Sequence, residues 1–371
     1  MEYDLNIGET DPRSAGMDSE HLALAAGILN EAVETEVCPG GVLWVARRGR
    51  SALLHAAGHT DYSRSTPIDE HTLFDLASVT KPVAMASSML VIIQEGRVHL
   101  GQNVVDFFPG KPLPHLRNVT LRHLLTHTSG LPPWRDCYSR GQTREQMIDD
   151  LFAIPLDHEP GTHYAYSCMG YIMLSLVLEA VTGKRVDEFA KERVFEPLGM
   201  HDTVYNPKPL EKYAIAATDH CPMRKCRLVG EVHDGNAYAL EGVSGNAGLF
   251  APMHDLARFC HAVTFGPFAG DELPFSPPAL RLIFANAIDE RIGGQTIGWF
   301  ISPNDMLPAG DLVSKSAIGH SGFTGTAIII DPGNELCAVL LTNRVCRDDD
   351  GTAFRHARRR IFNAVLGSIV W

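Results

Sequence analysis

Two strand-rich segments at opposite ends of this 371-residue chain constrain its fold more than any other feature of the sequence. Residues 40–58, GGVLWVARRGRSALLHAAG, predict two apolar strands joined at Arg48-Gly49, after an expected helix that begins at Asp18. Residues 325–345, GTAIIIDPGNELCAVLLTNRV, predict a second pair of strands around the turn signal at residues 331–334, before an expected terminal helix. Both ends of the chain therefore supply a helix and antiparallel strands.

We expect a fold of the α/β (α+β) class, in which the two chain ends meet in one antiparallel sheet flanked by helices. The middle of the chain differs, because its periodic segments, such as residues 120–132 and 168–200, are helical and separated by Pro and Gly stops. This pattern predicts a mostly helical domain at residues 78–244, inserted into an α/β domain made of residues 1–77 and 245–371.

The charge balance argues against two classes of partner. The chain carries 32 Lys and Arg against 44 Asp and Glu, a formal net charge of -12, which repels nucleic acid and anionic membranes. No apolar run approaches the roughly 20 residues that span a bilayer, so we expect no membrane span. The acidic N-terminus lacks the features of a signal peptide, and the eight scattered cysteines suit reduced thiols. We expect a cytoplasmic protein, or a periplasmic one if a leader has been removed.

The segment LASVTKPVAM, residues 76–85, places Ser78 three positions before Lys81 at the start of an expected helix. Positions three apart share one helix face, so the Lys81 Nζ can reach the Ser78 Oγ. A serine hydroxyl is a poor nucleophile without an adjacent base, and a lysine kept neutral by burial can be that base. Taken alone, the motif also suits a serine that caps a helix and a lysine that points to solvent.

Two later segments add candidates for chemistry. Tyr166 stands at the start of a long apolar helix, where it can exchange protons if nearby cations depress its pKa. His320-Ser321-Gly322 leads into a predicted strand, whose edge can align an extended substrate and whose glycine permits a close approach. A tyrosine of the core and a histidine in an incidental turn are the structural alternatives.

With these three segments in this order, the chain resembles the penicillin-recognising serine hydrolases. That superfamily includes class C β-lactamases, penicillin-binding D-alanyl-D-alanine carboxypeptidases and β-lactamase-like carboxylesterases, and its motifs are S-x-x-K, Y-x-N and K-T-G or H-S-G. They match here as residues 78–81, 166–168 and 320–322. The likeness runs from about residue 16 to the last helix, and residues 230–240, GEVHDGNAYAL, are similar to a loop of a subgroup with muropeptide amidases.

The resemblance implies a serine β-lactamase/transpeptidase-like fold with the active site between the two domains. It implies that Ser78 is the acylated nucleophile and that Lys81 holds or accepts its proton. Tyr166 would act as general base and then as general acid. His320 would supply positive charge or a hydrogen bond near Tyr166 and the substrate carboxylate.

The resemblance also assigns supporting groups. The backbone N–H groups of Ser78 and Phe323 would form the oxyanion hole, and the substrate would contact Cys168, Ser321 and Gly322. Neither a metal ion nor an organic cofactor is implied. His123 and His127 are four residues apart, but no third ligand accompanies them, so we expect satisfied helix-end histidines rather than a metal pair.

Two residues depart from the family pattern. Cys168 stands where the third motif position is usually Asn, and a thiol replaces the amide poorly as donor and acceptor, so recognition of amide substrates is in doubt. His320 replaces Lys, and an imidazole with an ordinary pKa of about 6.5 would lose its charge near neutral pH. We therefore expect activity on carboxylate-bearing substrates to fall as His320 deprotonates.

The sequence thus predicts a serine hydrolase that cleaves a small ester, β-lactam or peptide-like amide through an acyl-enzyme at Ser78. A muropeptide amidase or D-peptidase is the alternative within the same machinery. A non-catalytic penicillin-binding sensor on the same scaffold is the alternative from another class. The oligomeric state is not predicted.

Overall fold

A six-stranded antiparallel sheet, in the order β2-β1-β11-β10-β9-β8, combines strands from both ends of the chain. The computed structural model describes residues 7, 10–141, 143–207, 213–221, 223–267, 271–347 and 350–370. The strands of this sheet are β1 (Gly40–Arg47), β2 (Arg50–Gly58), β8 (Phe300–Ile301), β9 (Ile318–Ser321), β10 (Ala327–Asp331) and β11 (Leu336–Thr342). The central pairing of β1 with β11 joins the two chain ends, as the sequence predicts.

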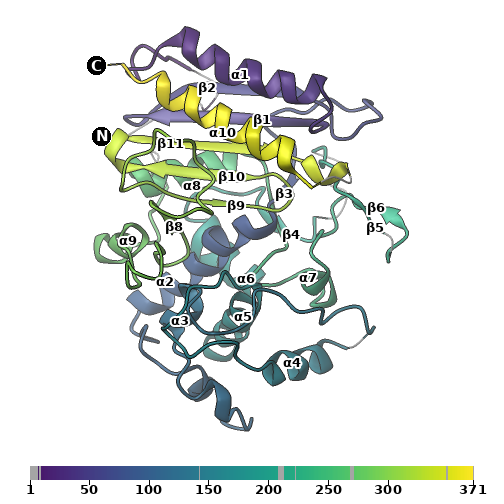
Figure 1. The fold of residues 1–371 in the computed structure, drawn as a ribbon, viewed down its shortest axis with the longest axis vertical. Coiled ribbons are helices and arrows are strands. Elements are labelled where there is room, and N and C mark those ends of the chain that lie inside the picture. Colours follow the sequence, from purple (N-terminus) through teal and green to yellow (C-terminus); the bar gives the residue numbers. More distant parts are fainter. Residues whose placement is uncertain are drawn as a thin grey trace.

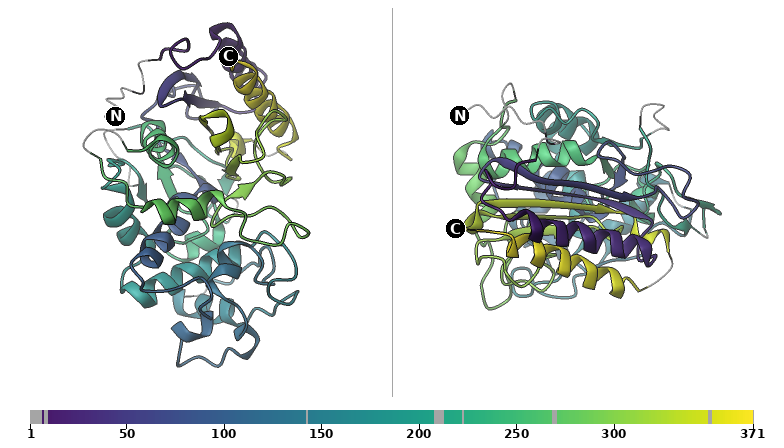
Figure 2. Two further views of the ribbon diagram at one scale, coloured as in Figure 1. Left: turned by 90° about the vertical axis from the view of Figure 1, so that its left-hand side faces the viewer. Right: turned by 90° about the horizontal axis from the view of Figure 1, so that it is seen from above.

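Helices cover both faces of the sheet. Helices α1 (Ser19–Glu34) and α10 (Thr352–Gly367) lie side by side on one face (Figures 1 and 2). Helix α8 (Met253–Phe265) packs on β11, β10 and β1, on the side of the helical region. Two hydrophobic cores result, and the alternation of side chains along β1 separates them: Val42 and Trp44 join one core, whereas Leu43 and Val45 join the other.

Local sequence explains the elements at the N-terminal end. Asp18 caps α1, and its carboxylate accepts a hydrogen bond from the backbone N–H of His21 at 2.9 Å. The turn between β1 and β2 has positive φ at Arg48 (52°) and Gly49 (72°), the backbone that a tight two-residue hairpin requires.

The middle of the chain supplies a mostly helical region below the sheet in Figure 1. Its α-helices are α2 (Ser87–Gln94), α3 (Leu121–Leu125), α4 (Arg144–Ala153), α5 (Cys168–Thr182), α6 (Val186–Ala190) and α7 (Gly235–Ala239), and α9 (Pro277–Phe284) follows α8. Short strands form a small sheet of β3 (Phe74–Asp75), β7 (Leu249–Ala251) and β4 (Val204–Tyr205), and a hairpin of β5 (His220–Cys221) and β6 (Cys226–Arg227). The expected fold class is confirmed, while the domain boundaries at 77/78 and 244/245 stay a prediction.

One helical stretch, Ala77–Gln94, has the length and hydropathy of a membrane span by composition alone. Because 83% of this stretch is buried inside the protein, it fits the central helix of a folded core. The apolar side chains of this stretch therefore pack in the protein core, and its first residues include Ser78 and Lys81.

Candidate active site

The segment that carries Ser78 begins as a 3-10 helix (Ala77–Val79), continues as a π-helix (Lys81–Ala86) and only then becomes the α-helix α2. Pro82 lacks a backbone N–H and cannot make the regular helical bond, and its carbonyl oxygen accepts a hydrogen bond from the Ser87 Oγ at 2.9 Å. Short π-helical turns occur frequently at functional sites. The expected helix is present, with an irregular first part at the candidate nucleophile.

Lys81 and Ser78 are in direct contact. The Lys81 Nζ lies 2.9 Å from the Ser78 Oγ, 2.9 Å from the backbone oxygen of Asn246 and 3.5 Å from the Cys168 Sγ. The Lys81 side chain is fully buried, and burial lowers its pKa, while the nearby Cys168 and Asp234 act in the opposite direction. The lysine therefore does not point to solvent.

A buried carboxylate holds the chain just before Ser78. Asp75 accepts hydrogen bonds from the backbone N–H of Ala77 (2.8 Å) and from the backbone N–H of His233 (2.7 Å). Ala77 has a positive φ of 45°, a conformation that costs free energy for a residue with a side chain. Asp75 therefore connects two loops by hydrogen bonds. One is the loop around Ala77 and Ser78, called the nucleophile loop below, and the other is the loop that follows Val232.

Tyr166 lines the same cavity as Ser78, and the Lys81 Nζ lies 5.0 Å from the centre of the Tyr166 ring. Burial raises the pKa of Tyr166 well above its ordinary value of 10.0. The condition expected from the sequence for proton exchange, a pKa lowered by nearby cations, is not met. At neutral pH the phenol therefore keeps its proton and can donate it.

His320 lies on β9 and is completely buried, stacked on Phe300 with ring centres 4.4 Å apart and 6.0 Å from the ring of Tyr166. Burial is the main cause that lowers the pKa of His320 well below 6.5, and Lys81 lowers it further whenever Lys81 is protonated. The imidazole is therefore neutral at pH 7, and its Nδ1–H donates to the backbone oxygen of Ser321 at 3.1 Å. Positive charge, one of the two contributions expected of His320, is not available in this environment.

The rest of the third motif lies beside the nucleophile loop. A Cβ at Gly322 would come within 2.3 Å of the backbone oxygen of Leu76, so glycine permits β9 to approach this loop closely. Strand β8 pairs only with Ile318 and Gly319, which leaves the Ser321 end of β9 beyond the reach of β8. Such an end is where an extended substrate could add to the sheet.

A cavity of about 440 Å³ opens at the Ser78 hydroxyl. Its lining residues come from the nucleophile loop, the segments around residues 134–138 and 166–168, the loop at 233–235 and the third motif; they are Ala77, Ser78, Trp134, Tyr138, Tyr166, Cys168, His233, Asp234, Gly235, Ala247 and Phe323. Five residues to which the sequence assigned roles, Ser78, Lys81, Tyr166, Cys168 and Phe323, thus lie in or directly beneath one cavity. Ser321 and Gly322 are not among its lining residues.

His127 lies at the end of α3, directly after its C-cap Thr126, and it also contacts the candidate site. Its Nδ1 accepts a hydrogen bond from the backbone N–H of Ser167 (3.0 Å), and its buried ring lies 4.6 Å from the ring of Tyr166. It therefore packs against the candidate proton donor as well as lying at a helix end. His123 closes a helix end, in a capping box with Thr120. The segment THTSG, part of the family resemblance, was the available signal for His127.

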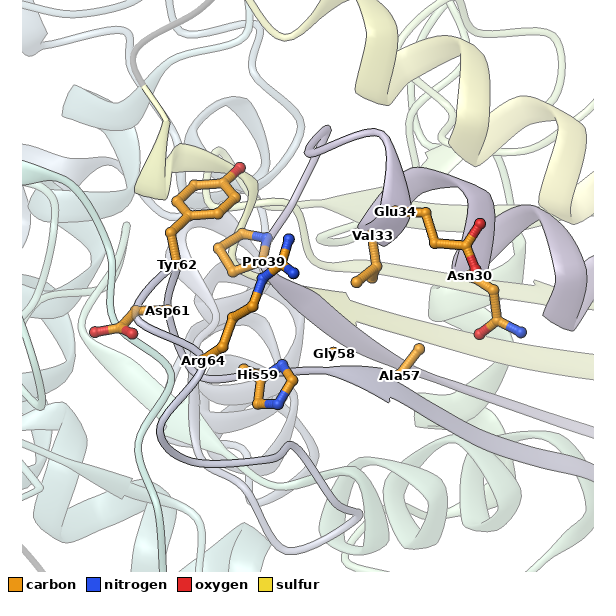
Figure 3. A pocket seen from close by; sticks show the side chains of 10 residues that line it. All are labelled: Asn30, Val33, Glu34, Pro39, Ala57, Gly58, His59, Asp61, Tyr62 and Arg64. Atoms are coloured by element: carbon orange, nitrogen blue, oxygen red, sulfur yellow. The ribbon is translucent and has the colours of Figure 1, made fainter.

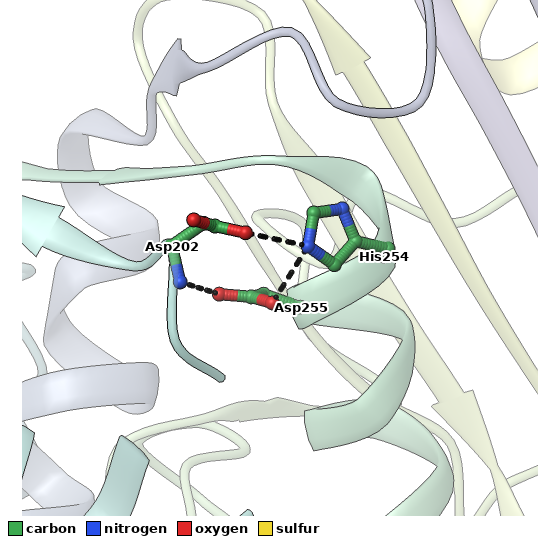
Figure 4. Close-up of side chains that lie close together, drawn as sticks. All are labelled: Asp202, His254 and Asp255. Carbon is green, nitrogen blue, oxygen red and sulfur yellow. Dashed lines mark hydrogen bonds and ion pairs between the residues drawn. The ribbon is translucent and has the colours of Figure 1, made fainter. Parts of the chain in front are cut away.

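Two other features of the described chain lie apart from the candidate catalytic residues. A cavity of about 290 Å³ beside α1 and β2 contains none of the candidate catalytic residues (Figure 3). Asp202, His254 and Asp255 have donor atoms within 4.8 Å of one another, a spacing that a metal ion could use. In Figure 4 the His254 Nε2 lies between the two carboxylates, 3.1 Å from each, which is the arrangement of an ion pair. We assign no metal to it.

Comparison with known proteins identifies the family of this chain. The model of the beta-lactamase family matches residues 25–361. The chain belongs to the beta-lactamase family. A putative D-alanyl-D-alanine carboxypeptidase of Escherichia coli (strain K12) is 31% identical, with 91% of this chain and 86% of the relative covered. An N-acetylmuramyl-L-alanine amidase of Bacillus subtilis (strain 168) is 30% identical, with 82% and 77% covered.

The fold also matches solved structures. EstCE1, described as a hydrolase with promiscuous acyltransferase activity, superposes with a TM-score of 0.73 at 21% identity, over 92% of this chain and 99% of its own. This member of the beta-lactamase family is therefore a serine hydrolase of the penicillin-recognising superfamily, with the fold expected from its sequence.

Proposed function

We propose that this beta-lactamase-family protein hydrolyses small esters, β-lactams or peptide-like amides through an acyl-enzyme at Ser78. One observation carries the proposal: the Lys81 Nζ is 2.9 Å from the Ser78 Oγ, and Ser78 and Tyr166 line one cavity. A nucleophile, a buried base and a protonated acid are what acyl transfer requires.

The three contacts of Lys81 support its role as the base. A neutral amine has two N–H donors and one lone pair. The donors can go to the Asn246 carbonyl and the Cys168 Sγ, which leaves the lone pair directed at the Ser78 hydroxyl. Burial favours this neutral form because it lowers the pKa of Lys81.

Acylation would proceed by transfer of one proton from the serine to the leaving group. The Ser78 Oγ attacks the carbonyl carbon while its proton moves to the Lys81 Nζ, and the backbone N–H groups of Ser78 and Phe323 stabilise the oxyanion. When the bond to the leaving group breaks, the Tyr166 hydroxyl protonates the departing atom. The Lys81 ammonium, 5.0 Å from the centre of the Tyr166 ring, then returns its proton to the phenolate.

Hydrolysis of the acyl-enzyme would use Lys81 as the base again. A water molecule attacks the ester carbonyl and gives one proton to Lys81. The Ser78 oxygen then leaves and takes this proton back, so the acid product departs and the enzyme is restored.

The test is an intact-mass assay with p-nitrophenyl acetate, nitrocefin and a fluorescent penicillin. We expect turnover of at least one reagent and a transient adduct on Ser78, both abolished in Ser78→Ala. Ser63→Ala, which alters an exposed loop serine, is the control and should retain both. A stable adduct without turnover would instead support the sensor, and no adduct with any reagent would refute the acyl-enzyme.

A further inference from the structure

We propose that Asp234 binds an ammonium group of the substrate, so that the preferred substrates are esters or amides of amino acids with a free α-amino group. This inference rests on the proposed function, in which the acyl group of the substrate is attached to Ser78. It selects among the substrate classes that the catalytic residues alone leave open.

Asp234 shares the cavity with the reacting groups. Asp234, Ser78 and Tyr166 all line this cavity. Asp234 directly follows His233, whose backbone N–H donates a hydrogen bond to Asp75. The Asp234 Oδ1 accepts a hydrogen bond from the backbone N–H of Ala237 at 2.7 Å, which fixes the carboxylate at the start of α7. The charge of Asp234 acts on both Lys81 and Tyr166 by raising their pKa values, so the carboxylate is within electrostatic reach of the site of attack.

The charge of the cavity favours a cation over an anion. Asp234 is the one carboxylate among the lining residues given above, and neither Lys nor Arg is among them. Arg344 reaches the Phe323 ring, 4.7 Å from its centre, but is not a lining residue. Buried His320 is neutral at pH 7. Among these lining residues a substrate carboxylate would meet no Lys or Arg, whereas an ammonium group would meet Asp234.

Aromatic rings stand beside this carboxylate. The Tyr138 ring lies so close to Gly235 that a Cβ at residue 235 would come within 2.5 Å of the ring. The rings of Trp134 and Tyr138 pack edge to face, with their centres 6.3 Å apart. Ring faces attract ammonium groups, and a carboxylate next to such rings strengthens that preference. Because an α-ammonium is two bonds from the carbonyl carbon that Ser78 attacks, an amino-acid ester can place both groups in one cavity.

Three matched esters test the inference at pH 6.5, where an α-amino group of ordinary pKa near 7.7–8.0 is charged. They are alanine methyl ester, N-acetylalanine methyl ester and N-succinylalanine methyl ester, in D and L forms, with hydrolysis followed by acid release. In at least one configuration we expect kcat/KM for the free amine to exceed that for the acetyl ester by roughly tenfold or more, with the succinyl ester slowest.

Two variants locate the effect. Asp234→Asn keeps an oxygen for the Ala237 N–H but removes the charge, and it should reduce the free-amine preference to within about threefold. Asp136→Asn is the matched control, because Asp136 also accepts backbone N–H bonds near the cavity but does not line it, and its preference should match that of the natural protein.

Two results would overturn the inference while the proposed function survives: an acetyl ester hydrolysed at least as fast as the free amine, or a preference unchanged in Asp234→Asn. No turnover of any ester together with no adduct on Ser78 would refute the acyl-enzyme and, with it, this assignment.

Discussion

Cys168 touches Lys81 at the position where the superfamily motif usually has Asn. Its Sγ is 3.5 Å from the Lys81 Nζ, and a thiol is a weak donor and a weak acceptor. Since an Asn side chain can hold both Lys81 and a substrate amide, Cys168→Asn should raise kcat/KM for amides relative to esters by roughly tenfold. The measurement is the ratio of rates on N-acetylalanine p-nitroanilide and N-acetylalanine methyl ester.

Cys168→Ser is the control for this substitution, because a hydroxyl is small and cannot span to a substrate amide as a carboxamide can. The ratio for Cys168→Ser should stay within about threefold of that of the natural protein. An unchanged ratio in Cys168→Asn would mean that Cys168 does not set the preference between esters and amides.

The burial of His320 predicts a pH profile that differs from the one expected from its sequence motif. Because burial lowers the pKa of His320 well below 6.5, the imidazole loses its proton below the physiological range and stays neutral from pH 6 to pH 8. The profile of kcat/KM between these pH values should therefore have the same shape in the natural protein and in His320→Gln, whatever the change in height. An inflection near pH 6.5 that disappears in His320→Gln would contradict this result.

At the scale of elements, Asp75 joins the nucleophile loop to the loop that carries Asp234. Asp75→Ala leaves the backbone N–H groups of Ala77 and His233 without their acceptor, so both loops should shift. We expect the rate of Ser78 acylation by p-nitrophenyl acetate to fall by roughly tenfold or more, and the preference for a free amino group to fall with it.

Asp69→Ala is the control for Asp75, since Asp69 accepts a backbone N–H from His71 on a turn outside the cavity. Its acylation rate and substrate preference should stay close to the natural values, with folding checked by circular dichroism. If Asp75→Ala remains folded and keeps both properties, the carboxylate does not position the site.

The elements that the sequence predicted well depend on local signals. The β1–β2 hairpin follows from Arg48-Gly49 between apolar runs, and α1 follows from the cap at Asp18. The π-helical start of the nucleophile segment depends on how Pro82 packs, and the small sheet joins strands as distant as β3 and β4 through β7. Such features arise from contacts between distant segments, which periodicity does not encode.

The candidate site likewise combines contacts that the sequence predicts with contacts that depend on the folded chain. Ser78 and Lys81 are close in sequence, so their contact could be predicted from helix spacing. The contact of the His127 ring with Tyr166 and the place of Asp234 in the cavity could not be predicted from spacing, because each depends on how its own loop folds. The pKa directions of Tyr166 and His320 also escaped prediction, since burial, their main cause, is a property of the folded chain.

At the scale of the whole molecule, an ion pair links the helical region to the layer beneath the sheet. His254, in the first turn of α8, contacts the carboxylates of Asp202 and Asp255, and Asp255 also accepts the backbone N–H of Asp202 (Figure 4). Because α8 packs on β11, this cluster fastens the turn that contains Asp202 to the main sheet. We therefore expect this cluster to contribute to the free energy of unfolding of the whole protein.

Burial lowers the pKa of His254, but its hydrogen bonds and charge interactions with Asp255 and Asp202 outweigh burial and raise the pKa above 6.5. A raised pKa means that folding stabilises the protonated form, so this contribution is complete below pH 6.5 and is lost as pH rises through the folded-state value. His254→Gln should lower the free energy of unfolding by about 1.5–3 kcal/mol at pH 6 and by much less at pH 9, as measured by urea denaturation. His21→Gln removes an exposed histidine paired with Asp18 and should change stability by less than about 1 kcal/mol at either pH. An equal loss for His254→Gln at both pH values would show that His254 stabilises the fold by packing and not by charge.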